Sequence, residues 1–255
     1  PDAGYGRKFY HWLHSRHPEP YSSYGNGSAM RVSPCGFAAE SLEEAIRLAG
    51  MTAEVTHNHP EGMKGARAVA AATFLARQGK SKAQIKEYTE ENFYPLDFTL
   101  DQIRDEYLFH VDCMNSVPQA IEAFLEGEDF EDCIRNAVSI GGDSDTIGAM
   151  CGAIAEAYYG LDESWIDKAR EYCRPKMFCY VEALEIICNG YAPDFIFEGT
   201  LALAGTAKAM KLFCRTVGKG QGKPQAKPLD DAYRAGADEV LSQDEIDMLL
   251  DGRKE

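Results

Sequence analysis

At 255 residues with 45% hydrophobic content, the chain can bury a sizeable core as one large domain or two small ones. Its net charge of −15 argues against a nucleic-acid backbone as partner, although an anionic ligand can still bind through backbone N–H groups, helix N-termini or a metal. No apolar run reaches membrane-spanning length, and eight scattered cysteines without a C-x-x-C pair favour a reduced, cytoplasmic protein over a disulfide scaffold or zinc protein.

The first predicted helix covers residues 7–17. It carries His11, His14 and His17 at i, i+3 and i+6, a spacing that places them on one helical face ahead of Pro18. A metal triad is one interpretation. Three exposed histidines on a surface helix are the better one, because no partner carboxylate lies nearby in the sequence.

The second feature is a turn, Gly25-Asn26-Gly27-Ser28, which opens into a short helix. Its glycines allow close approach of the backbone to a ligand, and the N–H groups that follow can hold phosphate. It matches neither the G-x-G-x-x-G pattern nor a Walker loop. On local evidence alone, an ordinary loop is the default interpretation.

The next helices are predicted over 42–55, with Ser41 and Glu44 as a capping box, over the Ala-rich, buried stretch 61–78, and from Ser81 to about residue 92. Between the first two lie His57 and His59. Both stand at a helix junction beside a proline, where a histidine is a ligand, an acid–base group or a simple turn residue.

Residues 93–114 give a mixed pattern. Helices then follow from Pro118 to Gly127 and from about Asp129 to Ile140, and further helical patterns come after Asp162. Because helix follows helix with short joints and no clear strand alternation, the predicted fold is a compact, all-α, multi-helix domain.

An acidic cluster stands between two of these helices, directly after Gly141-Gly142. Asp143, Asp145 and Thr146 offer two carboxylates and a hydroxyl, which are hard ligands suited to Mg²⁺, Mn²⁺ or Ca²⁺. Helix capping is the alternative, since an acid favours a helix N-terminus. The spacing excludes an EF-hand. The run that follows, 147–154, is small and apolar, which predicts a helix buried nearly all round.

The C-terminal part has a different composition. Residues 217–237 are rich in Gly, Lys and Pro and predict a flexible linker. Residues 238–255 predict a short amphipathic tail helix, in which 241–250 could dock in the groove of a protein partner. This stretch weakly resembles the flagellar switch peptide that binds the response regulator CheY. A frayed tail is the alternative.

Three segments, taken together and in order, closely resemble the ADP-ribosylglycohydrolase family, the DraG-like or ARH-like hydrolases. They are Ser23 to Arg31, Thr56-His57-Asn58-His59-Pro60, and Gly141 to Ile147 with Ala157-Tyr158-Tyr159-Gly160. The predicted family domain covers 1–216. The resemblance implies an all-α fold with two Mg²⁺ or Mn²⁺ ions, and cleavage of the bond between ADP-ribose and a protein side chain, or of related N- or O-glycosidic linkages.

The resemblance also assigns site residues. It implies metal ligation by Asp143, Asp145 and Thr146, with the two aspartates as catalytic groups. It implies contact of His57 with the ligand, and an ADP-ribose cradle made by Ser23, Tyr24, Gly25, Asn26, Gly27 and Ser28. The implied partner is ADP-ribose or an ADP-ribosylated protein.

One departure from the family pattern affects these expectations. The family completes its metal site with an earlier Thr-Asp-Asp-Thr segment, which this sequence lacks. We therefore expect an N-terminally truncated domain with half of a dinuclear site and weak metal binding. The alternative function is a non-catalytic remnant that binds ADP-ribose or a nucleotide.

Overall fold

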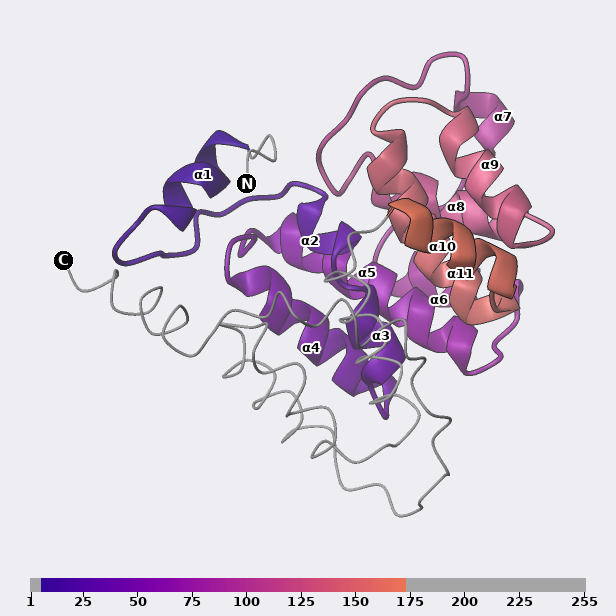
Figure 1. The fold of residues 1–255 in the computed structure, drawn as a ribbon, viewed down its shortest axis with the longest axis horizontal. Coiled ribbons are helices and arrows are strands. Elements are labelled where there is room, and N and C mark those ends of the chain that lie inside the picture. Colours follow the sequence, from indigo (N-terminus) through magenta and orange to yellow (C-terminus); the bar gives the residue numbers. More distant parts are fainter. Residues whose placement is uncertain (1–5, 173–255) are drawn as a thin grey trace. The chain divides into compact units, whose positions relative to one another are not determined.

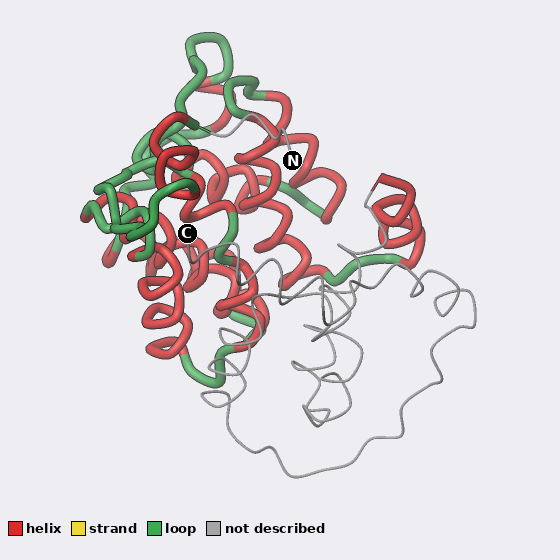
Figure 2. Tube along the Cα trace, turned by 60° about the vertical axis from the view of Figure 1, so that its left-hand side comes forward, coloured by secondary structure: helices red, strands yellow, loops and turns green. Residues whose placement is uncertain are grey.

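The computed structural model describes residues 6–172, and all regular elements in that range are helices. They are α1 Arg7–Leu13, α2 Gly27–Met30, α3 Ser33–Ala38, α4 Leu42–Glu54, α5 Pro60–Arg77, α6 Lys82–Asn92, α7 Leu100–Ile103, α8 Val117–Glu126, α9 Phe130–Ser139, α10 Ser144–Tyr159 and α11 Glu163–Tyr172. Figure 2 shows helices and loops but no strand in this range, where β-type pairing is limited to one bridge between Gly25 and Asp112. The predicted all-α class is confirmed.

The chain divides into two compact units, residues 1–161 and 162–255, so α1 to α10 belong to the first and α11 to the second. The predicted domain end at 216, the linker 217–237 and the tail helix 238–255 lie outside the described residues. None of the described helices combines the length and the apolar character that crossing a bilayer requires.

Helix α5 is the centre of the first unit (Figure 1), and α2, α3, α4, α6, α8 and α10 all contact it. Its sequence explains this position, because small side chains allow neighbouring helix axes to approach closely. All six of the following alanines are buried: Ala66, Ala68, Ala70, Ala71, Ala72 and Ala76. The prediction of a buried, Ala-rich helix here is confirmed.

Helix starts follow the predicted capping chemistry. At α6, the Ser81 hydroxyl accepts from the Gln84 N–H at 3.3 Å, and the Gln84 side chain accepts from the Ser81 N–H at 3.0 Å. At α4, the Ser41 hydroxyl accepts from the Glu44 N–H at 3.2 Å, but the Glu44 carboxylate accepts from Glu40 instead, at 2.9 Å. The predicted box at α4 is therefore only half formed.

Helix α1 is shorter than predicted. It ends at Leu13, where the sequence predicts a helix through residue 17. His14 follows the helix and its Nδ1–H donates to the Tyr10 carbonyl at 2.8 Å, while the next N–H turns back to Trp12, so the helical ladder stops. His11, His14 and His17 are all exposed, as the surface interpretation predicts, and they do not share one helix.

Helix α10 is buried on one side only, so the prediction of burial nearly all round is wrong. Thr146, Ile147, Met150 and Ile154 are buried, whereas Asp145 and Ala149 are exposed. A Cβ on Gly148 would meet no atom within 4 Å. Small residues on this face do not require burial, since they expose little apolar surface to water.

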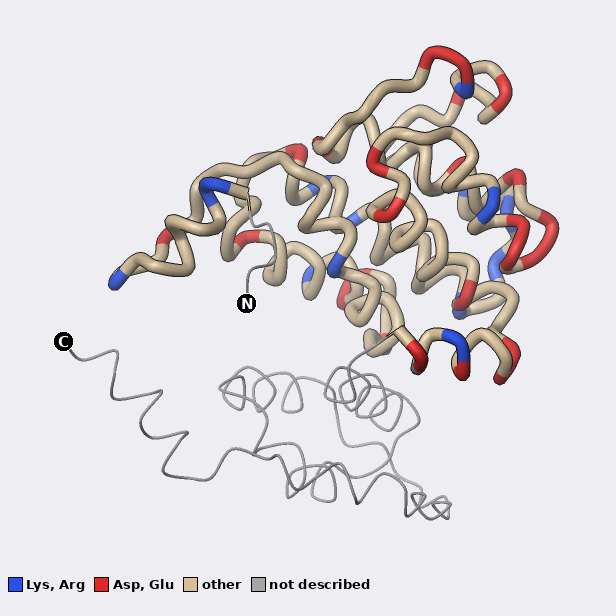
Figure 3. Tube along the Cα trace, turned by 45° about the horizontal axis from the view of Figure 1, so that its top comes forward, with Lys and Arg blue, Asp and Glu red and all other residues tan. Residues whose placement is uncertain are grey.

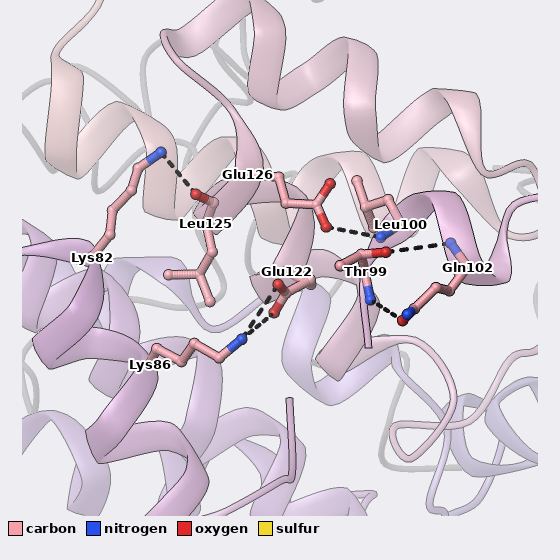
Figure 4. A network of polar contacts seen from close by, with 8 residues as sticks. All are labelled: Lys82, Lys86, Thr99, Leu100, Gln102, Glu122, Leu125 and Glu126. Carbon is pink, nitrogen blue, oxygen red and sulfur yellow. Dashed lines mark hydrogen bonds and ion pairs between the residues drawn. The ribbon is translucent and has the colours of Figure 1, made fainter. Parts of the chain in front are cut away.

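A polar network ties α6 and α7 to α8 (Figure 4). Lys86 lies 3.5 Å from Glu122, and Lys82 donates to the Leu125 carbonyl at 3.1 Å. The Glu126 carboxylate accepts from the Leu100 N–H at the start of α7, at 2.8 Å. These contacts hold α6, α7 and α8 together, and so fix both ends of the segment between residues 92 and 117.

The charge distribution agrees with an acidic surface. Figure 3 shows Asp and Glu segments in loops and at helix ends across the described part, with Lys and Arg segments among them. Several of the Lys and Arg side chains pair with acids three or four residues away on the same helix, as Arg135 does with Glu131. Such exposed pairs contribute little to stability.

Candidate active site

The acidic cluster is delivered by a two-glycine turn between α9 and α10. Gly141 and Gly142 have φ values of +73° and +64°, in the left-handed region that favours glycine. A Cβ on Gly142 would lie 2.6 Å from Tyr107 Cε1 and 2.9 Å from the Leu108 carbonyl oxygen. The turn therefore needs glycine for both its conformation and its packing, and its position sets that of Asp143.

Asp143 occupies the N-cap position of α10, but its carboxylate makes no capping hydrogen bond to the helix. Instead its Oδ2 accepts from Asn26 Nδ2 at 2.7 Å, across 117 residues of sequence, and both residues are buried. The capping interpretation does not explain this side chain. Asn26 comes from the glycine turn before α2, so the structure joins two of the segments that the resemblance assigns to one site.

The three candidate metal ligands differ in exposure. Asp143 and Thr146 are buried, at 9% and 7% exposed, whereas Asp145 is exposed. Burial raises the pKa of Asp143, and the adjacent Asp145 raises it further, while Asn26 and Thr146 act in the opposite direction. A carboxylate whose ionised form is disfavoured by burial and by a neighbouring acid marks a place where a cation would be stabilised.

The donor chemistry fits a hard divalent cation, since two carboxylates and a hydroxyl are ligands that Mg²⁺ and Mn²⁺ accept. The set is small, however. Among residues 6–172, no group of three or more His, Cys, Asp or Glu side chains converges as a metal-binding cluster. Asp143, Asp145 and Thr146 therefore offer part of a coordination shell. The thioether of Met30 lies 3.6 Å from the Thr146 hydroxyl and adds no hard oxygen donor.

The loop that provides Asn26 is clamped on two sides. The Ser23 N–H donates to the Thr56 carbonyl at 3.3 Å, and the Asn26 N–H donates to the Val111 carbonyl at 2.8 Å. A Cβ on Gly62 would lie only 2.5 Å from the Ser23 carbonyl oxygen, so the loop rests directly on the start of α5. These contacts hold the loop in place without a ligand.

The same contacts decide which loop amides remain available. Ser23, Gly25 and Asn26 use their N–H groups within the protein, with Gly25 donating to Ser23 Oγ at 3.2 Å. The N–H groups of Tyr24, and of Gly27 and Ser28 at the start of α2, have no acceptor within the described part of the chain. A phosphate cradle formed by this loop therefore relies on these three amides, of which Gly27 and Ser28 are adjacent.

Two loop side chains have partners other than Asp143. The Ser28 hydroxyl is buried and donates to the Gly62 carbonyl at 2.8 Å, which ties α2 to α5. The Tyr24 ring is 50% exposed and lies edge-on to His59, with the ring centroids 5.3 Å apart. Ser28 thus stabilises the loop, whereas Tyr24 presents an aromatic face at its rim.

His57 lies against the same loop. Its Nε2 is 3.6 Å from the position that a Cβ would take on either Gly25 or Gly27, and its Nδ1 is 2.7 Å from the Thr56 hydroxyl. Burial, together with the charge of Arg31, lowers the pKa of His57 to about 4. The imidazole is therefore neutral near pH 7.

The structure thus brings together Asn26, His57, the glycines of the loop and the Asp143 turn. Arg31 and Thr56 have no role predicted from the sequence, yet Thr56 contacts His57, and Arg31 contacts Thr56. Both residues stand in the segments that carry the family resemblance, but the contact between them links positions 25 residues apart, which no local sequence pattern reports.

Known proteins are similar to this chain over part of its length. The human ADP-ribosylhydrolase ARH3 is 32% identical over 199 residues, covering 59% of this chain and 55% of ARH3. The ADP-ribosyl-[dinitrogen reductase] glycohydrolase of Rhodospirillum rubrum is 28% identical over 160 residues, covering 58% and 52%. A solved ADP-ribosylglycohydrolase-related protein complex aligns with a TM-score of 0.49 and 28% identity, covering 61% of this chain and 58% of that one.

The chain thus spans about half the length of the curated relatives it matches. The ADP-ribosylglycohydrolase family profile matches residues 3–193, which is most of the sequence and includes every segment of the site described above. The chain belongs to the ADP-ribosylglycohydrolase family.

Proposed function

We propose that this chain is a metal-dependent hydrolase, or the part of one that holds the ligand, acting on ADP-ribosylated proteins or related N- or O-glycosidic ADP-ribosyl linkages. The observation that carries the proposal is the buried contact between Asn26 and Asp143. It joins a loop suited to a phosphate with a turn suited to a cation. Family membership and the names of the relatives support the same substrate class.

In this proposal, Asp143, Asp145 and Thr146 hold Mg²⁺ or Mn²⁺. The ion, when bound, supplies Lewis-acid stabilisation of negative charge and lowers the pKa of bound water. The residues of this chain do the rest. Asn26 orients the Asp143 carboxylate, the amides of Gly27 and Ser28 bind phosphate oxygens, and one of the two carboxylates accepts the proton of the attacking water.

A second function is supported by one observation, the small donor set. Two carboxylates and one hydroxyl among the described residues supply at most three of the six octahedral positions of Mg²⁺, so water must fill the others, and so few protein ligands hold the ion weakly. A module that binds ADP-ribose without cleaving it would need only the loop, His57 and the helix N-termini. Binding and turnover must therefore be measured separately.

The test uses the full 255-residue chain and mono-ADP-ribosylated protein substrates with arginine or serine linkages. Release of ADP-ribose that requires Mg²⁺ or Mn²⁺, and that Asp143→Asn with Asp145→Asn abolishes, supports the hydrolase. Asp97→Asn is the matched control, because Asp97 is exposed and lies outside the site. Calorimetric binding of ADP-ribose without release selects the binding module, and neither binding nor release refutes both functions.

A further inference from the structure

A chain of three polar side chains leads from α2 to His57. Arg31 Nη2 donates to the Thr56 hydroxyl oxygen at 3.1 Å, and that oxygen lies 2.7 Å from His57 Nδ1. Thr56 and His57 are 2% and 7% exposed, so water does not readily substitute for these partners. The mechanism above does not use Arg31 or Thr56, which raises the question of what their contacts determine.

The contacts determine which imidazole nitrogen carries the proton. A guanidinium only donates, so Arg31 occupies a lone pair of the Thr56 oxygen and leaves the Thr56 hydrogen to be donated. Tyr21 also lies beside Thr56, and its phenol hydroxyl can accept as well as donate, so the charge of Arg31 decides the direction at Nδ1. His57 Nδ1 then accepts from Thr56. The opposite arrangement would point an Nδ1–H toward the positive guanidinium behind Thr56, which electrostatics disfavours.

A neutral imidazole with a lone pair on Nδ1 carries its hydrogen on Nε2. Nε2 faces the loop between Gly25 and Gly27, at 3.6 Å from both Cβ positions. It has no hydrogen-bond partner within residues 6–172. The free N–H groups of Gly27 and Ser28 belong to the same loop, so three donors are presented to one region.

We propose that Arg31 and Thr56 are positioning residues that hold His57 in its Nε2–H tautomer, which makes His57 a neutral hydrogen-bond donor to an oxygen of the ADP-ribose moiety. The proposal rests on the proposed function for the identity of the ligand. The tautomer itself is a property of the free protein. It can therefore be measured independently of any activity.

The first test is NMR of the ¹⁵N-histidine-labelled full chain at neutral pH without ligand. Subtraction of the His57→Gln spectrum identifies the His57 signals among the six histidines. The expected result is a protonated Nε2 and an unprotonated Nδ1. A protonated Nδ1 in the wild-type chain would overturn the proposal, whether or not the chain binds ADP-ribose.

The second test removes the relay hydroxyl with Thr56→Val. We expect a mixture of His57 tautomers and about tenfold weaker binding of ADP-ribose in calorimetry, the effect of one misdirected hydrogen bond. Thr56→Ser should restore the wild-type tautomer and bring the affinity back to within about twofold of wild type. The matched control is Thr89→Val, because Thr89 is also buried and its hydroxyl donates to the Ile85 carbonyl within α6.

The outcomes distinguish the positioning role of Thr56 from the proposed function. An unchanged tautomer in Thr56→Val overturns the positioning role. If Thr56→Val does not fold, the wild-type spectrum and Thr56→Ser still decide, because loss of the Nε2–H form in Thr56→Ser would also overturn it. A wild-type chain with the Nε2–H tautomer that fails to bind ADP-ribose refutes the proposed function and confirms the tautomer.

Discussion

The contact between Asn26 and Asp143 predicts a measurable coupling between two distant parts of the sequence. Asn26→Ala removes a buried donor that lies 2.7 Å from the Asp143 carboxylate. A hydrogen bond to a charged group contributes about 1.5–3 kcal/mol, and its loss leaves part of a buried charge unsatisfied. We expect Asn26→Ala to lower the free energy of unfolding by about 2 kcal/mol, and to raise the pKa of Asp143 further.

A double-mutant cycle isolates the interaction energy between Asn26 and Asp143. Urea unfolding of wild type, Asn26→Ala, Asp143→Ala and the double variant at about pH 8, well above the ordinary pKa of an aspartate, should give a coupling energy of at least about 1 kcal/mol. Asn92→Ala combined with Asp143→Ala is the control pair, because Asn92 is exposed and bonds only within α6. That pair should be additive within about 0.5 kcal/mol. Additivity in the Asn26 cycle as well would refute the reasoning.

Three further predictions concern single features. His57 binds a proton below about pH 6.5 in the unfolded chain but only near about pH 4 in the folded chain, so acid favours unfolding. Between pH 7 and pH 5, the free energy of unfolding measured in urea should fall by about 2 kcal/mol more for wild type than for His57→Gln. Equal losses would contradict the pKa shift. Lys86→Met leaves the buried Glu122 carboxylate unpaired and should destabilise the fold by about 3 kcal/mol. Adding Glu122→Gln should restore the stability, which thermal unfolding of the single and double variants measures. Gly141→Ala should destabilise the fold by about 1–2 kcal/mol through backbone strain. Gly142→Ala should cost at least about 1 kcal/mol more, because only its Cβ would also clash with Tyr107 and Leu108. Equal losses of stability in chemical denaturation would show that packing plays no part.

Helix positions were predictable wherever the signals are local. The Ser81 cap defines the start of α6, and Pro118 with Gly127 defines α8; the structure begins α6 directly after Ser81, and α8 at Val117, one residue before the predicted start. The early end of α1 was not predictable from periodicity, since the His14 side chain bonds back to the Tyr10 carbonyl and the Ser15 N–H turns to the Trp12 carbonyl in place of the next helical bond.

Burial was less predictable than helicity. The small and apolar composition of α10 predicted a helix buried nearly all round, yet Ala149 is exposed and a Cβ on Gly148 would meet no atom within 4 Å. Alanine and glycine are compatible with either environment, because they bury almost no surface, so a run of them does not specify which face packs. In α5 the same composition coincides with full burial, because several helices contact it from different sides.

The candidate site was predictable in its residues but not in its contacts. The resemblance names Asn26, His57 and Asp143 as members of one site, and the structure places the first and third in direct contact. The resemblance does not specify that Asn26 orients Asp143, or that Thr56 orients His57. Such contacts depend on side-chain geometry across a folded chain, which no spacing along the sequence encodes.

In the proposed function an acidic protein holds a diphosphate, and the arrangement of helix starts accounts for this. Asn26 and Asp143 are the N-cap residues of α2 and α10 and are hydrogen-bonded to each other, so these two helix N-termini lie together. Each leaves backbone N–H groups without helical acceptors, and in α10, the longer of the two, these groups carry the positive end of the dipole. The net charge of −15 is screened by salt over a Debye length of about 8 Å, whereas amides in contact with a phosphate act at hydrogen-bond distance. Local dipoles therefore outweigh the overall charge where the ligand would bind.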